Sequence, residues 1–377
     1  MDENLPVIRI SVRNLVEFIL REGDIDNRTG GGQDPENMQM GSRIHRKIQR
    51  QMGSDYQAEV PLKTEIVCEG FTLKIEGRAD GLIHTKEQVM VDEIKGVLRE
   101  LDRVQEPVGI HLAQAKCYAS MVAEQEGVDE IGVQMTYCQM ETEEVKRFQY
   151  SYQKNELKVW FDEVIRQYEK WAKFQIEWRK ARNASIKGIE FPFPYRKGQR
   201  ELAVSVYRTI LRKKKLFIQA PTGVGKTIST VFPAVKAVGE ELGEKIFYLT
   251  AKTITRTVAE QAFETLREQN LKFKVITLTA KEKICFCEET SCNPDDCPYA
   301  KGHFDRVNDA VYELLMQEDV MSREVLEAQA RKHKVCPFEM ALDVSTWVDG
   351  VICDYNYVFD PDARLRRFFA EGGAGGY

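Results

Sequence analysis

Apolar residues in the first half of the chain alternate between the spacing of helices and the spacing of strands. Two helices are predicted first, Val12–Arg21 with Ser11 as its cap and a second over Met40–Met52. Three strands, a helix, two strands and a long charged helix follow, at Tyr56–Val67, Phe71–Ile83, Gln88–Gly96, Gly109–Glu126, Gly132–Met140, Glu144–Ser151 and Asn155–Lys180. This order predicts an α/β domain with a mixed sheet over residues 1–182.

The second half begins after a change to Gly, Pro and aromatic residues, which predicts a linker over residues 183–194. Short, continuously apolar strands then alternate with helices, as in a parallel sheet. The predicted elements are Gln199–Leu211 (helix), Leu216–Gln219 (strand), a helix expected to kink or restart at Pro233, Lys245–Leu249 (strand), Ile254–Gln269 (helix) and Phe273–Leu278 (strand). From residue 281 the sheet pattern stops, and helical segments are predicted at Phe304–Leu315 and Ser322–Lys332.

Composition fits a folded protein of two or three domains. The 377 residues are 43% hydrophobic and 30% charged, and no apolar run reaches the length of a membrane span. The N-terminus lacks a signal-peptide pattern, so the expected location is the cytoplasm, where nine cysteines favour metal ligands or buried thiols over disulfides. A net charge of −5 gives no global indication of nucleic-acid binding, although local basic tracks remain compatible with it.

The stretch between the predicted strand Leu216–Gln219 and the helix after it matches the Walker A phosphate loop. Small residues let backbone N–H groups curl around a phosphate, the lysine reaches the β- and γ-phosphates, and the threonine hydroxyl binds Mg²⁺. The loop residues are Ala220, Pro221, Thr222, Gly223, Val224, Gly225, Lys226 and Thr227. Their place between a predicted strand and a predicted helix favours ATP binding over a plain turn.

Residues before this loop leave two questions open. An aromatic–Arg–Gln element ending at Gln199 resembles one found in some helicases, where it implies that the glutamine contacts adenine or supports the loop. The basic run Arg212–Lys215 is a possible DNA-binding patch, but a solvated charge run is the favoured interpretation.

Carboxylates and a lysine follow two predicted strands of the first domain. Asp80 lies near the end of one strand, and Glu93 and Lys95 share one face of the next because side chains alternate along a strand. Such a group can hold a divalent ion and activate a water molecule. Asp92 points to the other face and is the less favoured ligand. Gln114 and Tyr118, four residues apart, share one face of a helix.

With a histidine on an upstream helix, these residues resemble the RecB-type branch of the PD-(D/E)XK nucleases. The matching residues, in that family's order, are His45, Asp80, Glu93, Lys95, Gln114 and Tyr118. The resemblance implies that His45, Asp80 and Glu93 bind Mg²⁺ or Mn²⁺ and that Lys95 orients the attacking water. It also implies that Gln114 and Tyr118 hold DNA or position the lysine. Cys68, Cys117 and Cys138 do not match the iron–sulfur arrangement of some relatives.

Five of the nine cysteines lie within residues 281–340. Their surroundings resemble the cluster insertion of XPD- and DinG-type superfamily 2 DNA helicases. The resemblance implies a 4Fe–4S cluster held by Cys285, Cys292, Cys297 and Cys336, with Cys287 as the spare. Zinc is the second choice, because four thiolates also suit it.

Together the two resemblances predict an α/β protein with an N-terminal PD-(D/E)XK nuclease fold and a partial RecA-like P-loop motor interrupted by a cysteine-rich, mostly helical insertion. The expected domains are 1–182 (nuclease), 183–194 (linker), 195–280 (motor), 281–340 (insertion) and 341–377 (return into the motor). The implied function is an ATP-dependent DNA helicase with a fused nuclease, in DNA repair or replication, acting on single-stranded or forked DNA. No membrane partner is expected.

Two other functions remain open: a metal-dependent single-strand nuclease whose motor part only binds DNA and ATP, and a non-enzymatic ATP- and cluster-binding module completed by a partner. No Asp-Glu in the chain is followed by Ala-His, so a Walker B pair of that form is missing. The chain is therefore expected to be the front part of a longer helicase, with weak nucleotide binding and no turnover by itself.

Overall fold

The chain folds as two units that divide within one long helix. The computed structural model describes residues 5–28, 35–221, 223, 225–251, 253–360, 365 and 368. Unit 1 consists of Met1–Glu22 and Asp26–Ile176, and unit 2 of Gly23–Ile25 and Glu177–Tyr377. Helix α4 (Lys154–Gly188) therefore contributes its first part to unit 1 and its last turns to unit 2.

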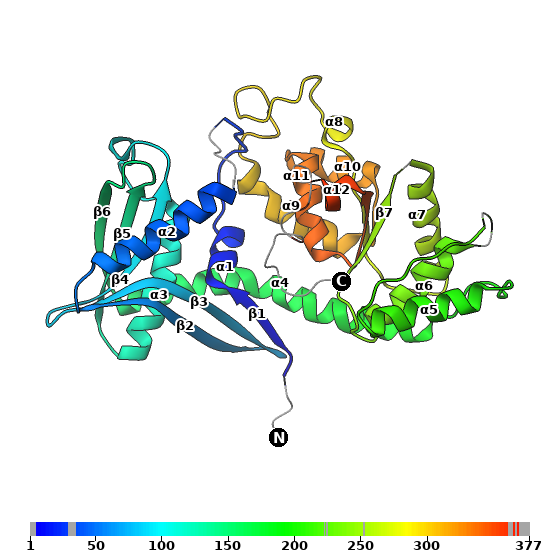
Figure 1. The fold of residues 1–377 in the computed structure, drawn as a ribbon, viewed down its shortest axis with the longest axis horizontal. Coiled ribbons are helices and arrows are strands. Elements are labelled where there is room, and N and C mark those ends of the chain that lie inside the picture. Colours follow the sequence, from blue (N-terminus) through cyan, green and yellow to red (C-terminus); the bar gives the residue numbers. More distant parts are fainter. Residues whose placement is uncertain are drawn as a thin grey trace. The chain divides into compact units, whose positions relative to one another are not determined.

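Unit 1 is a mixed α/β domain, as the sequence predicts (Figure 1). In chain order its other elements are β1 (Val7–Ser11), α1 (Val12–Ile19), α2 (Pro35–Gln51), β2 (Tyr56–Cys68), β3 (Phe71–His84), β4 (Val89–Val97), η1 (Leu101–Arg103), α3 (Gly109–Glu126), β5 (Glu130–Gln139) and β6 (Val145–Gln153). Ser11 caps α1 as predicted, since its hydroxyl accepts from the N–H of Asn14 at 3.1 Å. The sequence analysis missed β1, which pairs parallel to β3.

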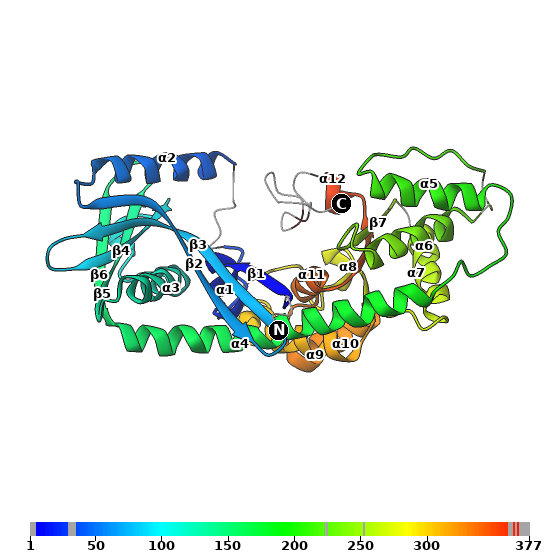
Figure 2. The same cartoon turned by 90° about the horizontal axis from the view of Figure 1, so that it is seen from below.

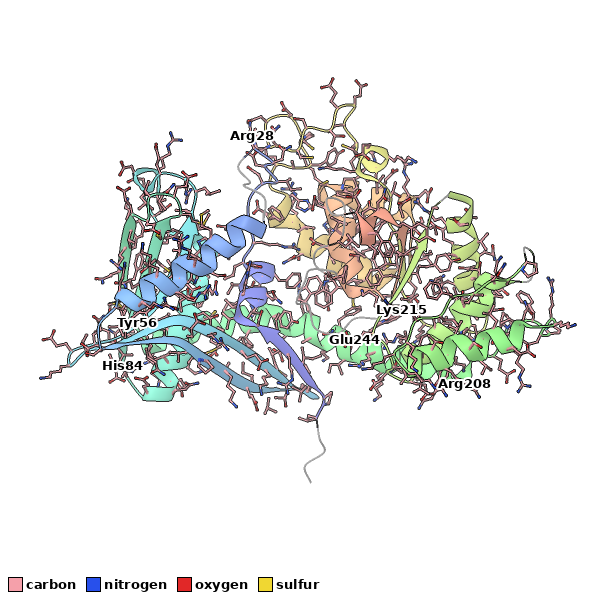
Figure 3. All side chains as sticks on the ribbon, in the orientation of Figure 1. Arg28, Tyr56, His84, Arg208, Lys215 and Glu244 are labelled. Carbon is pink, nitrogen blue, oxygen red and sulfur yellow. The ribbon has the colours of Figure 1, made fainter. Side chains whose placement is uncertain are left out.

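The six-stranded sheet of unit 1 has a fork beside β3. One edge of this strand pairs with β1 over Thr72–Glu76 and then with β4 over Gly81–His84. Its other edge pairs with β2 along nearly its whole length, from Tyr56 to the hairpin, and Figure 3 labels Tyr56 and His84 at the far end of this pair. Residues 77–80 are left between the two partners, so β3 and β4 diverge at this point.

Helices cover both faces of this sheet. Ile44 and Ile48 of α2 pack on Ile94 of β4, and α3 packs on β4 and β5 from the other side. Figure 2 shows α2 on one side of the sheet and α3 and α4 on the opposite side. Because Glu93 and Lys95 alternate with Ile94, they face α3.

Unit 2 contains a parallel four-stranded sheet in the order β7-β10-β8-β9. Its elements after α4 are α5 (Gln199–Leu211), α6 (Lys226–Gly239), β7 (Ile246–Thr250), α7 (Thr253–Arg267), β8 (Val275–Thr277), α8 (Lys281–Ile284), α9 (His303–Gln317), β9 (Val320–Met321), α10 (Arg323–His333), α11 (Pro337–Trp347), β10 (Gly350–Asp354) and α12 (Asn356–Phe359). The parallel sheet and its helices agree with the sequence prediction.

Two predicted features of unit 2 are wrong. Leu216–Gln219 is irregular rather than a strand, and the Phe217 side chain is 94% exposed. The apolar run has no described strand beside it, so its backbone lacks the hydrogen bonds that define a strand. Helix α6 continues through Pro233 without restarting, and it buries Val231 and Val235 on either side of the proline in the core of the unit.

The last turns of α4 are part of the core of unit 2. The helix extends eight residues beyond the predicted end at Lys180, into the expected linker. The Asp349 carboxylate accepts from Trp178 Nε1 at 2.9 Å and from Arg182 Nη1 at 2.8 Å, and both members of this Arg–Asp pair are buried. Further along, Ile186 and Ile189 join the hydrophobic core formed by α6 and α7. In the described residues, no helix is long and apolar enough to cross a membrane.

Candidate functional sites

The fork of the unit 1 sheet brings together the residues that the sequence singled out. Asp80 lies where β3 leaves β4, and its Oδ2 accepts from the backbone N–H of Ile94 at 2.7 Å. Its other oxygen, Oδ1, lies 3.3 Å from His45 Nδ1 on α2. Strand β4 then presents Glu93 and Lys95 beside this pair.

Lys95 is held by two oxygen acceptors. Its Nζ donates to Glu93 Oε1 at 2.9 Å and to Gln114 Oε1 at 3.0 Å. Gln114 in turn donates from Nε2 to the Tyr118 hydroxyl at 3.4 Å. The Tyr118 ring occupies the space that a side chain at Gly77 would need, since a Cβ there would lie 2.7 Å from the hydroxyl oxygen. The chain Glu93–Lys95–Gln114–Tyr118 is thus continuous.

Glu93 is the most electrostatically unusual residue of this site. Its side chain is 2% exposed, and Oε2 has no hydrogen-bond partner among the described residues. Burial raises the pKa of Glu93 to about 7, against the opposing effect of Lys95. For His45, burial is outweighed by the neighbouring carboxylates, so the pKa of His45 is raised.

Neighbouring Asp92 has a structural environment, as its predicted position on the other face implies. Its carboxylate is fully buried and accepts from the Tyr56 hydroxyl at 3.0 Å, the Gln134 amide at 3.0 Å and the Thr136 hydroxyl at 2.6 Å. These three donors occupy the oxygens that a metal ion would need.

The residues at the fork suit a divalent cation. Among the described residues, no three His, Cys, Asp or Glu side chains already lie in a metal-binding arrangement. However, Glu93 Oε2 is a buried oxygen without a donor, and carboxylate and imidazole groups are the ligand types that Mg²⁺ and Mn²⁺ accept. His45, Asp80 and Glu93 also act on one another electrostatically, as expected for side chains around one small space.

In unit 2, the phosphate-loop residues lie at the start of α6. Gly223 and Gly225 have φ values of +80° and +71°, which glycine adopts without strain. The Lys226 ammonium donates to the backbone oxygen of Ala220 at 2.8 Å, so the lysine folds back over the loop. Thr227 lies 3.5 Å from the hydroxyl of Tyr248 on β7. Pro221 is described and exposed, whereas Thr222 and Val224 lie outside the described residues.

Gln199 lies against the phosphate loop. Its Oε1 accepts from the backbone N–H of Arg196 at 2.8 Å. A Cβ added at Gly225 would lie 2.4 Å from Gln199 Nε2, so the amide lies directly against this glycine. The guanidinium of Arg196 donates to the backbone oxygen of Gly223 at 3.0 Å. This geometry favours loop support, the second of the two roles expected for the glutamine.

The insertion places its five thiols in two neighbourhoods. All nine cysteines are free thiols. The Sγ atoms of Cys287 and Cys297 lie 3.7 Å apart, and Cys285 interacts with Cys287. Cys336 begins α11, and both it and Lys281 interact with Cys292. The structure therefore pairs Cys287, the expected spare, with Cys297, and the set of four ligands stays a prediction.

Comparison with known proteins gives matches in unit 2. Residues 200–286 match the DEAD/DEAH box helicase model, and residues 250–369 match the DEAD_2 model. This part of the chain is similar to DEAD/DEAH-type helicases. The matched segments begin in α5 and include the phosphate loop, the cysteine insertion and β10.

Individual relatives are other helicases. The human Regulator of telomere elongation helicase 1 is 21% identical over 228 residues, which is 47% of this chain and 18% of that protein. A Probable ATP-dependent helicase of Methanocaldococcus jannaschii is 31% identical over 121 residues, covering 32% of this chain and 18% of that protein. The chain thus spans less than a fifth of the length of these relatives.

Two solved structures match with low overall similarity. One titled XPD_Helicase has a TM-score of 0.31 at 17% identity and covers 47% of this chain and 30% of its own. One titled Truncated XPD has a TM-score of 0.31 at 18% identity and covers 45% and 48%.

Proposed function

We propose that this protein is an ATP-dependent DNA helicase of the iron–sulfur superfamily 2 type with a fused metal-dependent DNA nuclease, acting in DNA repair or replication. Its substrate would be single-stranded or forked DNA. The observation that carries the nuclease is the meeting of His45, Asp80, Glu93 and Lys95 at the fork of the unit 1 sheet. The match of residues 200–369 to helicase models supports the motor.

In the nuclease, His45, Asp80 and Glu93 would hold Mg²⁺ or Mn²⁺, which when bound lowers the pKa of a water molecule and polarises the phosphate. The chain's own groups do the rest. Lys95 carries three N–H donors, and two are held by Glu93 and Gln114, so the third is aimed by its neighbours. This N–H orients the attacking water or the phosphate oxygen. Tyr118 fixes Gln114, and through it the lysine.

In the motor, the backbone of residues 220–225 would surround the ATP phosphates and Lys226 would exchange its contact with Ala220 for the phosphate oxygens. Thr227 would leave Tyr248 to ligate Mg²⁺. Gln199 and Arg196 hold the loop in shape. In the insertion, Cys285, Cys292, Cys297 and Cys336 would hold the 4Fe–4S cluster. Thiols are the donors that this cluster requires, with zinc as the alternative.

The motor is tested by DNA-stimulated ATP hydrolysis. Lys226→Ala should abolish it, because no other described side chain of the loop can neutralise the γ-phosphate. Lys215→Ala is a matched control, since this lysine belongs to the exposed basic run before the loop. Loss in the first variant with retention in the second is expected. ATP hydrolysis that survives Lys226→Ala would refute the motor assignment.

A further inference from the structure

A histidine beside the candidate nuclease site lies outside the six-residue set. His111 is the third residue of α3, and Gln114 and Tyr118 follow it by three and seven positions. Residues at this spacing share one face of a helix, so His111 extends the row of polar side chains on the side of α3 that faces Lys95. It is partly buried.

Tyr137 fixes the orientation of this imidazole. Tyr137 is fully buried on β5, where it is the pairing partner of Lys95 on β4. Its hydroxyl accepts from the backbone N–H of Val108 at 3.0 Å and lies 3.1 Å from His111 Nδ1. The strand position beside Lys95 therefore supplies the group that holds His111.

The hydrogen bonds select one tautomer of His111. The Tyr137 oxygen already accepts from Val108, so its single proton is directed to Nδ1 of the imidazole. The imidazole proton is then on Nε2. Burial, with the nearby positive charges of Lys95, Arg99 and Arg13, lowers the pKa of His111 to about 4. At neutral pH the residue is an uncharged donor of fixed orientation.

Resting on the proposed nuclease, we propose that His111 donates its Nε2–H to a backbone phosphate of the DNA strand, next to the phosphate that is cut. Tyr137 is a positioning residue that acts through it. Phosphate oxygens accept hydrogen bonds from neutral donors as well as from cations, and such contacts fix the register of a strand. Lys95 and Arg99 supply the neighbouring positive charge. A purely structural role, in which the pair only anchors the start of α3, is the competing explanation.

The test is binding of a labelled single-stranded oligonucleotide to the whole protein in EDTA, followed by fluorescence anisotropy over a range of salt concentrations. A hydrogen bond to a charged group contributes about 1.5 to 3 kcal/mol, so His111→Ala should weaken binding by about ten- to a hundredfold. Because the lost donor is neutral, the slope of log Kd against log salt should not change. His111→Gln, which keeps an N–H, should recover most of the affinity. Tyr137→Phe should weaken binding less than His111→Ala.

Arg99→Ala is the charged control, and it should lower the salt slope by about one. Unchanged binding by His111→Ala would overturn the proposal. Equal losses in His111→Ala and His111→Gln with a lowered Tm would also overturn it, in favour of the structural role. Failure of the nuclease itself is separate: it would appear as DNA cleavage that survives Glu93→Gln, whatever the binding data. Normal loss of cleavage in Glu93→Gln with unchanged binding by His111→Ala would reject only the phosphate contact.

Discussion

Two adjacent carboxylates of β4 differ in what surrounds them. Asp92 accepts three side-chain hydrogen bonds, whereas Glu93 leaves Oε2 without a donor although both residues are buried. Leaving a buried charged oxygen unpaired costs free energy, and folded proteins retain such atoms mainly where a ligand completes them. At the residue scale, this contrast separates the candidate ligand from its structural neighbour.

The lowered pKa of His111 predicts a pH dependence of stability. Between pH 6.5 and about 4, the unfolded chain binds a proton at this position and the folded chain does not. Stability is therefore lost as pH falls through this window. His111→Gln cannot titrate, so from pH 7.5 to pH 5.0 the wild type should lose about 1 to 2 kcal/mol of unfolding free energy relative to the variant. Urea unfolding of both proteins at the two pH values measures this, and parallel curves would contradict it.

At the element scale, α4 is anchored in unit 2 by a buried ion pair. Arg182 Nη1 donates to Asp349 Oδ1 at 2.8 Å, and their side chains are 8% and 4% exposed. The second carboxylate oxygen is taken by Trp178 and by the backbone N–H of Lys274 at 2.8 Å. Both oxygens of Asp349 are thus paired, and the helix end is joined to the start of β10.

Removing one partner of this pair should destabilise unit 2. Arg182→Ala leaves Asp349 buried without its cation, which costs about 3 to 5 kcal/mol. Arg179→Ala on the same helix is the matched control, since its ion pair with Glu241 is about half exposed and contributes about 0 to 1 kcal/mol. Thermal unfolding should show a large drop in Tm for the first variant only. Similar Tm values for the two variants would mean that the buried pair has little effect.

The sequence predicted local features of these elements better than contacts between distant residues. Alternation along β4 was enough to put Glu93 and Lys95 on one face and Asp92 on the other, because this depends only on strand geometry. The anchor at Asp349 and the contact of Tyr137 with His111 join residues 167 and 26 positions apart, which no local pattern encodes. For His111, the spacing to Gln114 and Tyr118 was an available indication.

The wrong predictions have related causes. The apolar run Leu216–Gln219 satisfies the composition of a strand, but strand formation also needs a neighbour, and none of the described strands lies beside it. The predicted end of α4 near Lys180 relied on local composition, whereas Ile186 is buried in the core and extends the helix. In both cases tertiary packing decided the outcome.

At the scale of the whole molecule, the account assigns DNA cleavage to unit 1 and ATP-dependent movement to unit 2. The two sites use different residues, so each should be removable without the other. Glu93 and Lys226 are suitable for this separation, since one lies in the nuclease site and the other in the phosphate loop.

The most direct measurement of this claim is Mn²⁺-dependent cleavage of single-stranded DNA by the wild type, Glu93→Gln and Lys226→Ala. Glu93→Gln removes the charge that would bind the metal while keeping the shape of the side chain, so cleavage should fall by at least about a hundredfold. Lys226→Ala should cut single strands as well as the wild type does. Equal cleavage by the wild type and Glu93→Gln would contradict the assignment of a metal-dependent nuclease to the fork of the unit 1 sheet.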